Sequence, residues 1–303
     1  MRVGLFIPVC NEDRFLRRQA DSIRMQKTRP DQICVVDSST RKLDLEPYAQ
    51  LGAEIKIIES VDFDHGGTRN LALEIFGGCE IVSFLTHDAI LASPDSLRRL
   101  CECFSRDTVG AAYGRQRPHE DADHFSKHAR HFNYPGMSTA KSLQDAARLG
   151  LKTPFISNSF SAYRKKTLQD IGGFPEKVIL GEDMFAAGRV LLSGQVVAYC
   201  AEAEVYHSHN YSSLDEFRRY FDTGVFHRDH QWLLQTFGRA EGEGRRFVLS
   251  ELRYLLEHAP GRVPEALLRT VLKYLGYRLG RHYDRLPRQI LPILSMNRGY
   301  WKT

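Results

Sequence analysis

The sequence predicts an α/β fold, with a parallel sheet covered by helices over residues 1–210 and a helical region over residues 211–303. Three observations support this prediction. Short apolar runs alternate with amphipathic stretches in the N-terminal part of the chain, which is typical of strand–helix–strand units. Several of the apolar runs end in polar residues. From residue 212 onward, apolar residues recur mainly at helical spacing.

The predicted sheet begins at the N-terminus. The run Val3–Val9 (VGLFIPV) is continuously apolar, as is typical of a strand buried on both faces. Three further strands are predicted over residues 32–37, 54–59 and 80–85. Helices are predicted between these strands, over residues 11–27 and 68–76, because apolar residues recur there every three or four positions.

The rest of the chain is less regular. Residues 119–153 are polar, rich in histidine and poorly periodic, so we expect an extended loop or an irregular region near the site. Beyond it we expect order from residue 155, a Gly172-Gly173 turn, a helix over 183–192, and one or two strands within 195–206. In the helical region, Ser213-x-x-Glu216 predicts a capping box, and helices are predicted over 244–257 and 264–281.

Composition disfavours several classes of protein. The net charge of +5 is too small to indicate a nucleic-acid binder, and no helix-turn-helix, zinc finger or RNA-binding aromatic pattern occurs. The six cysteines form no CxxC pair, so we expect buried, reduced thiols. Neither a signal peptide nor a transmembrane run is recognisable, so we expect a cytoplasmic protein that is soluble or peripheral to the membrane.

The C-terminal region is the basic part of the chain. Ten Lys and Arg residues lie between Arg253 and Lys302, against three acidic residues. Within residues 264–281, basic residues alternate with apolar residues at helical spacing, namely Leu267, Leu268, Val271, Leu272, Leu275 and Leu279. The favoured interpretation is a helical subdomain that packs on the sheet. The alternative is a basic amphipathic surface resting on the inner membrane.

Polar residues follow three of the predicted strands. Because the carboxyl ends of parallel strands meet at one edge of a sheet, these residues should lie close together. They are Asn11, Glu12, Asp37, His87 and Asp88. Asp37 could accept a hydrogen bond from a nucleobase or a ribose hydroxyl, or could simply form a turn. Asp88 could bind a divalent ion that bridges two phosphates, or could cap a helix.

Three further segments contain residues that could take part in catalysis or in binding a metal or an anion. Asp183, in Gly181-Glu182-Asp183, could act as a general base, or both acids could stabilise a helix N-terminus. His207 and His209 would share one face of a strand and could bind a metal, although no HExxH motif supports a zinc hydrolase. Gly66-Gly67 before a helix would allow backbone to approach an anion, and Arg69 would offer a fork of donors.

As a set, these segments resemble the family 2 glycosyltransferases. The resemblance extends over about residues 2–210 and rests on five blocks in the order IPVCNE (7–12), VVDS (35–38), GTRN (67–70), FLTHD (84–88) and GGF with GED (172–174 and 181–183). It implies the GT-A fold, with a Rossmann-like mixed sheet. One departure stands out, because the family's usual DxD motif is here Thr86-His87-Asp88 and lacks the first Asp.

The resemblance also implies roles for particular residues. Asp183 would be the catalytic base, with Glu182 holding the acceptor or orienting a loop, and Asp88 and His207 would bind Mg²⁺ or Mn²⁺. Asn158 and Ser159 would line the sugar pocket. The implied nucleotide contacts come from Pro8, Val9, Asn11, Glu12, Asp37, Arg69 and His87.

Within the family, the chain is most similar to bacterial rhamnosyltransferases of surface polysaccharide synthesis. The similarity is carried by FDHGGTRN (63–70), LTHDA (85–89) and VILGEDM (178–184). It implies an inverting transfer from dTDP-β-L-rhamnose to a lipid-linked or polysaccharide acceptor. The alternatives are transfer of another sugar, such as galactofuranose or N-acetylglucosamine, and a non-catalytic subunit that binds nucleotide sugars, which the incomplete DxD would suit.

Overall fold

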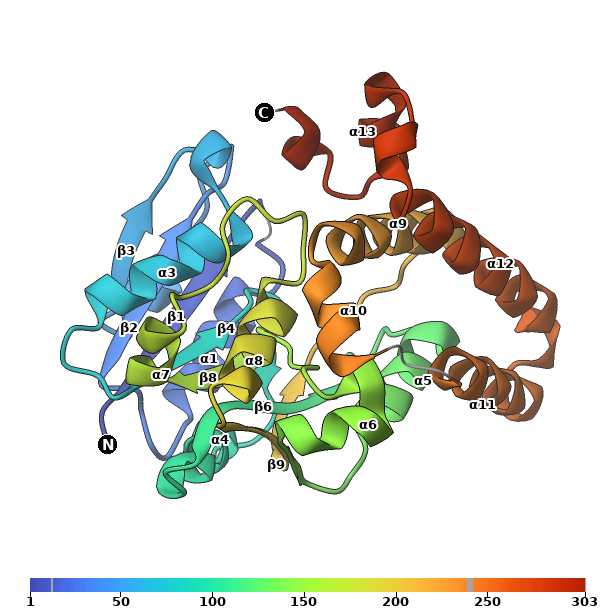
Figure 1. The fold of residues 1–303 in the computed structure, drawn as a ribbon. Coiled ribbons are helices and arrows are strands. Elements are labelled where there is room, and N and C mark those ends of the chain that lie inside the picture. Colours follow the sequence, from blue (N-terminus) through green and yellow to red (C-terminus); the bar gives the residue numbers. More distant parts are fainter. Residues whose placement is uncertain (12, 239–241, 303) are drawn as a thin grey trace.

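The computed structural model describes residues 1–11, 13–238 and 242–302. Within these residues, one sheet of nine strands runs through the larger part of the molecule (Figure 1). The strand order is β3-β2-β1-β4-β8-β6-β9-β5, with β7 beside β9. The strands are β1 (Val3–Val9), β2 (Gln32–Asp37), β3 (Glu54–Ile57), β4 (Ile81–Leu85), β5 (Ile90–Leu91), β6 (Val109–Arg117), β7 (Thr139–Lys141), β8 (Phe160–Arg164) and β9 (Val196–Tyr206).

One half of the sheet is parallel. Strand β1 pairs with β2 and β4, and β2 pairs with β3, all in parallel. Val9 lies opposite Asp37, so the polar residues that follow these strands come to the same edge, as the sequence predicted. The strands β1 and β4 are buried along their whole length because helices cover both faces of the sheet.

Two hydrophobic clusters occupy the two faces of the sheet. On one face, Phe6 and Val36 pack with residues of α3 (His65–Ile75) and α8 (Glu182–Leu192). On the other face, Leu5 and Ile7 pack with residues of three helices. These helices are α1 (Leu16–Arg24), α2 (Glu46–Ala49) and α4 (Ser96–Glu102).

The other half makes the sheet mixed. Strand β8 runs antiparallel to both β4 and β6, whereas β6 and β9 are parallel. The short helix α7 (Lys165–Asp170) follows β8 directly. Alternation of strands and helices alone predicted a parallel sheet, and the family resemblance predicted the mixed one that is found.

The expectation of an extended loop over residues 119–153 is wrong. This segment contains α5 (His124–Asn133), β7 and α6 (Ala146–Leu149). Asp123 caps α5 by accepting a hydrogen bond from the Ser126 amide at 2.7 Å. The buried Phe125 of α5 contacts Leu255 and Ala266, which lie far along the chain, so local periodicity could not reveal the helix.

The C-terminal region is helical and contains α9 (Ser213–Asp229), α10 (Gln231–Phe237), α11 (Glu243–His258), α12 (Val263–Gly280) and the short α13 (Leu291–Leu294). Helices α9 and α10 contribute Phe221, Val225 and Phe237 to the core, whereas α11 and α12 form an arm that extends away from the sheet (Figure 1). Helices α9 and α12 pack closely through glycines. A Cβ added at Gly276 would lie 2.3 Å from the carbonyl oxygen of Phe217, and one at Gly280 would lie 2.0 Å from that of Phe221.

The start of α9 differs from the prediction by one residue. The capping box joins Ser212 and Asp215, rather than Ser213 and Glu216. Both serines have an acid three positions later, so the sequence is compatible with two capping boxes that differ by one residue. Glu216 instead forms an ion pair, in which its carboxylate lies 3.4 Å from the buried guanidinium of Arg269.

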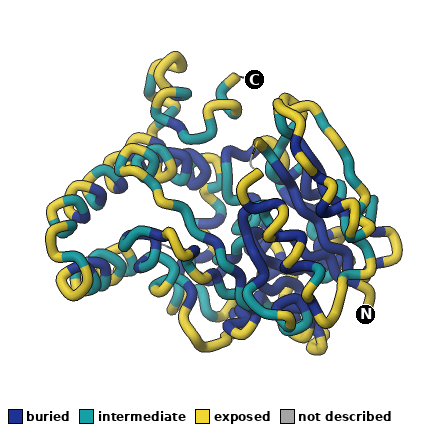
Figure 2. Tube along the Cα trace, turned by 180° about the vertical axis from the view of Figure 1, so that it is seen from behind, coloured by how far each residue is buried: buried dark blue, intermediate teal, exposed yellow. Residues whose placement is uncertain are grey.

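The leucines of α12 do not pack on the sheet, which corrects the favoured interpretation of this helix. Leu267, Leu268 and Val271 are each more than half exposed. The basic residues Arg269 and Lys273 are instead the buried side chains. Figure 2 shows the contrast between the buried strands of the sheet and the largely exposed helical arm.

Candidate active site

Three potential metal ligands lie together beyond the ends of β4 and β9. Nε2 of His207 is 3.3 Å and Nε2 of His209 is 3.6 Å from Oδ2 of Asp88. Ligand atoms of all three residues lie within 4.8 Å of one another. The pairing of β5 with β9 explains this proximity, because Ile90 lies opposite Tyr206 and so brings the preceding Asp88 beside the residues that follow Tyr206.

Hydrogen bonds fix the orientation of His207. The Gln116 amide donates from Nε2 to Ser157 Oγ at 3.0 Å, which leaves Gln116 Oε1 facing His207 Nδ1 at 3.0 Å. Since Oε1 can only accept, Nδ1 carries a proton, and Nε2, 3.3 Å from Asp88 Oδ2, is the nitrogen left to bind a metal. Metal-binding histidines are held in the same way in other proteins.

The charge state of the cluster suits a divalent cation. Burial opposes ionisation of Asp88, but His207, His209 and His87 outweigh it and hold the pKa of this carboxyl well below its usual value. Burial and the neighbouring His207 lower the pKa of His209 to about 3, so its imidazole is neutral at physiological pH. One carboxylate and two imidazoles are a donor set that fits a divalent metal ion.

A cavity of about 380 Å³ opens beside this cluster. Its lining includes His87, Asp88 and His209, together with Tyr211, whose ring stacks on His209. His119 also lines it, and its Nε2 lies 3.1 Å from the backbone carbonyl oxygen of Asp88. The cavity therefore gives a small polar ligand access to the three potential metal ligands.

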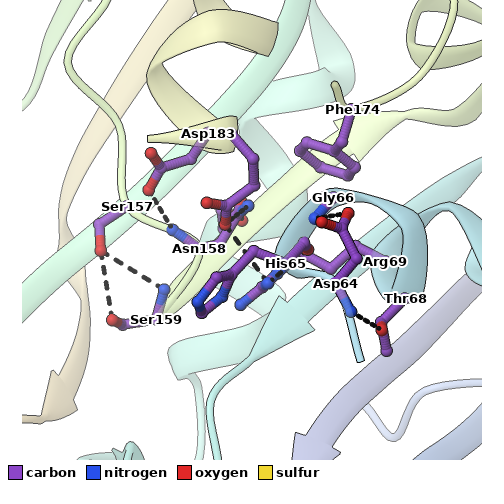
Figure 3. Close-up of polar contacts among 12 residues, drawn as sticks. Asp64, His65, Gly66, Thr68, Arg69, Ser157, Asn158, Ser159, Phe174 and Asp183 are labelled. Carbon is purple, nitrogen blue, oxygen red and sulfur yellow. Dashed lines mark hydrogen bonds and ion pairs between the residues drawn. The ribbon is translucent and has the colours of Figure 1, made fainter. Parts of the chain in front are cut away.

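Asp183 and Glu182 occupy the first turn of α8. Gly181 precedes them with a φ of +82°, a left-handed conformation that favours glycine. Asp183 is half-buried and accepts hydrogen bonds from two amides, that of Met184 at 2.7 Å and that of Asn158 at 3.3 Å (Figure 3). Burial and the neighbouring charge of Glu182 raise the pKa of Asp183 to about 7.

Glu182 has the opposite electrostatic environment. Its Oε1 lies 3.3 Å from Nη1 of Arg69, and both side chains are buried. Although burial favours the neutral acid, the charges of Arg69 and His65 outweigh it and lower the pKa of Glu182. Arg69 is held in place by a 2.8 Å hydrogen bond from Nη1 to the carbonyl oxygen of His65. The two adjacent acids therefore differ in pKa, as in sites where one carboxylate is a structural anion and the other titrates near neutrality.

The segment 157–159, which Figure 3 shows beside Asp183, joins the cluster of three potential metal ligands to the two acids. Ser159 Oγ lies 3.3 Å from His207 Nε2, while the amide of Asn158 donates to Asp183. The side chain of Asn158 is buried, and its Nδ2 donates to Glu182 Oε1 at 3.3 Å. Its Oδ1 accepts from the hydroxyls of Ser161 and Tyr163. Residues 157–159 thus connect Asp88 and His207 to Asp183, although the three residues are far apart in the chain.

The remaining predicted residues lie at the ends of β1 and β2. Pro8 and Val9 are buried in β1. Asp37 is buried and accepts a hydrogen bond from the Ser39 amide at 2.9 Å, so it forms a turn. Asn11, with φ of +53°, bridges the two strand ends by accepting a hydrogen bond from the Thr40 amide at 3.0 Å. Glu12 lies outside the described residues.

Gly66 serves packing rather than contact with an anion. A Cβ at Gly66 would lie only 1.8 Å from the carbonyl oxygen of Pro175. Asn70 holds the same loop, because its side chain accepts from the Phe174 amide at 2.8 Å and donates to the Phe174 carbonyl oxygen at 3.0 Å. The TRN and GGF blocks are therefore in contact, and they fix α3 against the segment that leads to Asp183.

Several residues of the site were not predicted. His209 was recognised as sharing a face with His207 but was left out of the metal set, and Gln116 gave no sequence signal. Arg130 and Arg219 were also missed. Both lie close enough to His209 to lower its pKa, after the larger effects of burial and His207. Neither guanidinium has an ion-pair partner within the described parts of the chain, and Nε of Arg130 is buried without a hydrogen bond.

Comparison with known proteins agrees with this architecture. Residues 5–172 match the sequence profile of glycosyl transferase family 2. The chain is 46% identical to the O-antigen chain rhamnosyltransferase RfbN of Salmonella typhimurium, over 99% of this chain and 96% of that protein. It is 45% identical to the O-antigen chain rhamnosyltransferase WbaN of Salmonella anatum, over 92% of this chain and 89% of that protein.

Solved structures resemble the fold at low sequence identity. The mannosyltransferase PcManGT from Pyrobaculum calidifontis, in complex with GDP-Man and Mn²⁺, has a TM-score of 0.57 and 17% identity, covering 99% of this chain and 84% of that one. S. aureus TarS 1-349 in complex with UDP-GlcNAc has a TM-score of 0.55 and 14% identity. The match covers 94% of this chain and 92% of that one. These similarities confirm the expected GT-A fold.

No helix in the described residues is both long enough and apolar enough to span a membrane. The sequence profile and the two relatives together confirm the resemblance noted from the sequence, and with it the expectation of an enzyme. The chain is a glycosyltransferase and belongs to glycosyl transferase family 2.

Proposed function

We propose that this enzyme transfers L-rhamnose from dTDP-β-L-rhamnose to a lipid-linked or polysaccharide acceptor in O-antigen synthesis, with inversion at the anomeric carbon. The choice of sugar and pathway is supported by the rhamnosyltransferase relatives, which match almost the whole chain. The inverting mechanism rests on one observation: the half-buried Asp183, with a pKa of about 7, is joined through residues 157–159 to the metal-binding cluster.

Asp183 is the general base of the proposed reaction. The acceptor oxygen forms a bond to the anomeric carbon while the bond from that carbon to the diphosphate oxygen breaks. Asp183 takes the hydroxyl proton, and dTDP leaves on the opposite face. Because a single displacement needs no nucleophile on the enzyme, one positioned base suffices, and such a base contributes roughly 10²–10⁴-fold to the rate.

Asp88, His207 and His209 would hold a divalent cation, which when bound would supply positive charge to the departing diphosphate. Two imidazole ligands favour Mn²⁺ over Mg²⁺, which prefers oxygen ligands. His209 thus takes the place of the carboxylate that the incomplete DxD motif lacks. Gln116 holds His207 in the tautomer that can bind the metal.

Other residues bind or position the donor. Arg130 and Arg219 would contact phosphate oxygens, since each guanidinium lacks a carboxylate partner among the described residues. The nucleoside would be held at the ends of β1 and β2, by Asp37, Asn11 and the backbone after Val9. His87 lines the cavity and would contact the nucleotide there.

Three predicted contacts are better assigned to positioning. Asn158 was expected in the sugar pocket, but its buried amide is fully engaged with Glu182, Ser161 and Tyr163. It therefore orients the two acids. Arg69 and Glu182 act as a buried ion pair that fixes the start of α8. Ser159, between the two centres, remains the proposed sugar contact.

A binding screen followed by product analysis tests this proposal. Thermal shifts would be measured with dTDP-rhamnose and with other nucleotide sugars, including UDP-galactofuranose and UDP-N-acetylglucosamine, each with and without Mn²⁺ or Mg²⁺. We expect a large, Mn²⁺-dependent shift with dTDP-rhamnose, and an α-linked product by NMR. A larger shift with another donor would indicate the alternative sugar. Donor binding without transfer or hydrolysis would indicate a non-catalytic subunit.

The proposed role in O-antigen synthesis also has consequences for where the enzyme is located in the cell. A lipid-linked acceptor would place the enzyme at the cytoplasmic face of the inner membrane, as a protein bound to the surface of the bilayer.

A further inference from the structure

Helix α12 exposes a continuous apolar stripe. Six large side chains on its outer side have exposed fractions from 36% to 62%. They are Leu267, Leu268, Val271, Tyr274, Leu275 and Leu279. Their spacing, mostly of three and four residues, places them on one face over slightly more than three turns of the helix. Isolated exposed leucines are ordinary, but a contiguous apolar stripe usually marks an interaction surface.

The inner side of α12 explains why this stripe has no partner within the chain. Arg269 and Lys273 are buried there, with exposed fractions of 4% and 7%. Arg269 pairs with Glu265 at 2.8 Å and lies over the Phe125 ring, 4.0 Å from its centroid. Gly276 and Gly280 then bring the helix into contact with α9. Charged and small residues thus form the intramolecular contact, and the apolar residues are left outside.

The surroundings of the stripe are basic. Arg278 is exposed at the C-terminal end of the same face, and Arg285 and Arg288 are exposed just beyond it. The nearby exposed acids are few, and one of them, Asp284, is paired with Arg228 at 2.8 Å. An apolar helical face with basic residues at its end matches the chemistry of an anionic lipid surface.

We propose that the apolar stripe of α12 lies in the interface of an anionic membrane and anchors the enzyme there. The helix has 18 residues, so at 1.5 Å per residue it would extend about 27 Å along the surface. Its inner face carries buried ion pairs, so it would lie on the bilayer rather than cross it. The attachment requires no particular donor sugar.

Charge and size favour a bilayer over a second copy of the chain. A standard protein interface uses about 20–30 residues on each side, whereas the stripe offers six apolar side chains on one helix. Two copies joined through α12 would also bring their basic C-terminal ends together. An anionic lipid surface instead attracts these charges and accepts a narrow stripe of leucines.

Vesicle flotation tests the proposal without donor or acceptor, so its result is independent of the enzyme's substrate. We expect the chain to float with vesicles containing phosphatidylglycerol, and to bind much more weakly to phosphatidylcholine alone or at high salt. Leu268→Glu combined with Leu275→Glu should lower partitioning by about tenfold or more, because two exposed leucines that would be buried in the bilayer are replaced by anions.

A matched control uses exposed leucines elsewhere. Leu143 and Leu192 are 38% and 46% exposed, and substituting both with Glu should leave flotation unchanged. A fluorescence measurement avoids dependence on the glutamate variant. The emission of Val271→Trp should shift to the blue on addition of anionic vesicles, whereas that of Leu192→Trp should not.

Two results would overturn the proposal. One is equal flotation of the wild type and the α12 variant, or no flotation of the wild type at all. The other is a wild-type dimer in lipid-free solution, by sedimentation equilibrium, that the α12 substitutions convert to a monomer. The stripe would then be an interface between copies.

Discussion

The guanidinium of Arg69 and the carboxylate of Glu182 form a buried ion pair, with Nη1 and Oε1 3.3 Å apart. The pair connects α3 to the first turn of α8. It keeps Glu182 ionised, and the charge of Glu182, together with burial, raises the pKa of the adjacent Asp183 to about 7. A buried ion pair can therefore raise the proton affinity of the proposed catalytic base.

The pH dependence of transfer should reflect this coupling. A base works when deprotonated, so kcat/KM should rise with pH through about 7 in the wild type. Glu182→Gln removes a negative charge that raises the pKa of Asp183, so the rising limb should move to lower pH. The pH profile of kcat/KM for both proteins provides the measurement. A rising limb that stays in place or moves to higher pH in Glu182→Gln would contradict the coupling between Glu182 and Asp183. Substitution of the exposed Glu257 with Gln serves as the control and should leave the profile unchanged.

Gln116 should control metal affinity without touching the metal. Gln116→Leu removes the acceptor for His207 Nδ1 and frees the ring to adopt the wrong tautomer. Loss of such a partner typically lowers metal affinity by about 10–100-fold. Mn²⁺ titration followed by electron paramagnetic resonance measures this directly. Gln116→Glu keeps an acceptor and should retain most of the affinity, so equal affinities for the Leu variant and the wild type would show that the hydrogen bond has no such role.

Arg219 should strengthen nucleotide binding. Removing a charged hydrogen bond to a phosphate typically costs about 1.5–3 kcal/mol. We therefore expect Arg219→Ala to weaken dTDP binding by tenfold or more in calorimetry. Arg189, an exposed arginine on α8, provides the control, and Arg189→Ala should bind dTDP normally. Identical affinities for both variants would remove Arg219 from the diphosphate site.

The packing of α12 on α9 can be tested through two glycines. A Cβ at Gly280 would meet the Phe221 carbonyl oxygen at 2.0 Å, whereas one at Gly244 of α11 would have no neighbour within 4 Å. Gly280→Ala should lower the free energy of unfolding by about 1–3 kcal/mol, the usual cost of overpacking. Gly244→Ala should be neutral or stabilise by up to about 1 kcal/mol. Denaturant unfolding measures both, and equal effects would contradict close packing at Gly280.

The sequence predicted the parallel half of the sheet well. The strands over residues 3–9 and 32–37 are observed with the predicted ends, because strands buried on both faces have continuous apolar runs. The proximity of Asp88 to His207 was inferred only through the family resemblance. It depends on the pairing of Ile90 with Tyr206, a long-range register for which neither segment carries a local signal.

The predictions for α5 and α12 failed for a related reason. Periodicity in α12 correctly indicated a helix with an apolar face, but it could not tell whether that face packs inward. Arg269 and Lys273 contact carboxylates and aromatic rings on other helices. The basic face of α12 therefore packs inward, and its apolar face is left exposed. Helix α5 likewise depends on partners from α11 and α12, more than a hundred residues away.

The role of Asp183 is tested most directly by comparing Asp183→Asn with the wild type in two assays on the same preparations. Transfer from dTDP-rhamnose to an acceptor glycan should fall by roughly 10²–10⁴-fold, because the amide cannot take the hydroxyl proton. Calorimetric affinity for the donor in the presence of Mn²⁺ should stay within a few-fold of the wild type, since Asp183 is not one of the three potential metal ligands. Retained transfer, or equal loss of transfer and donor binding, would contradict Asp183 as the base of this glycosyltransferase.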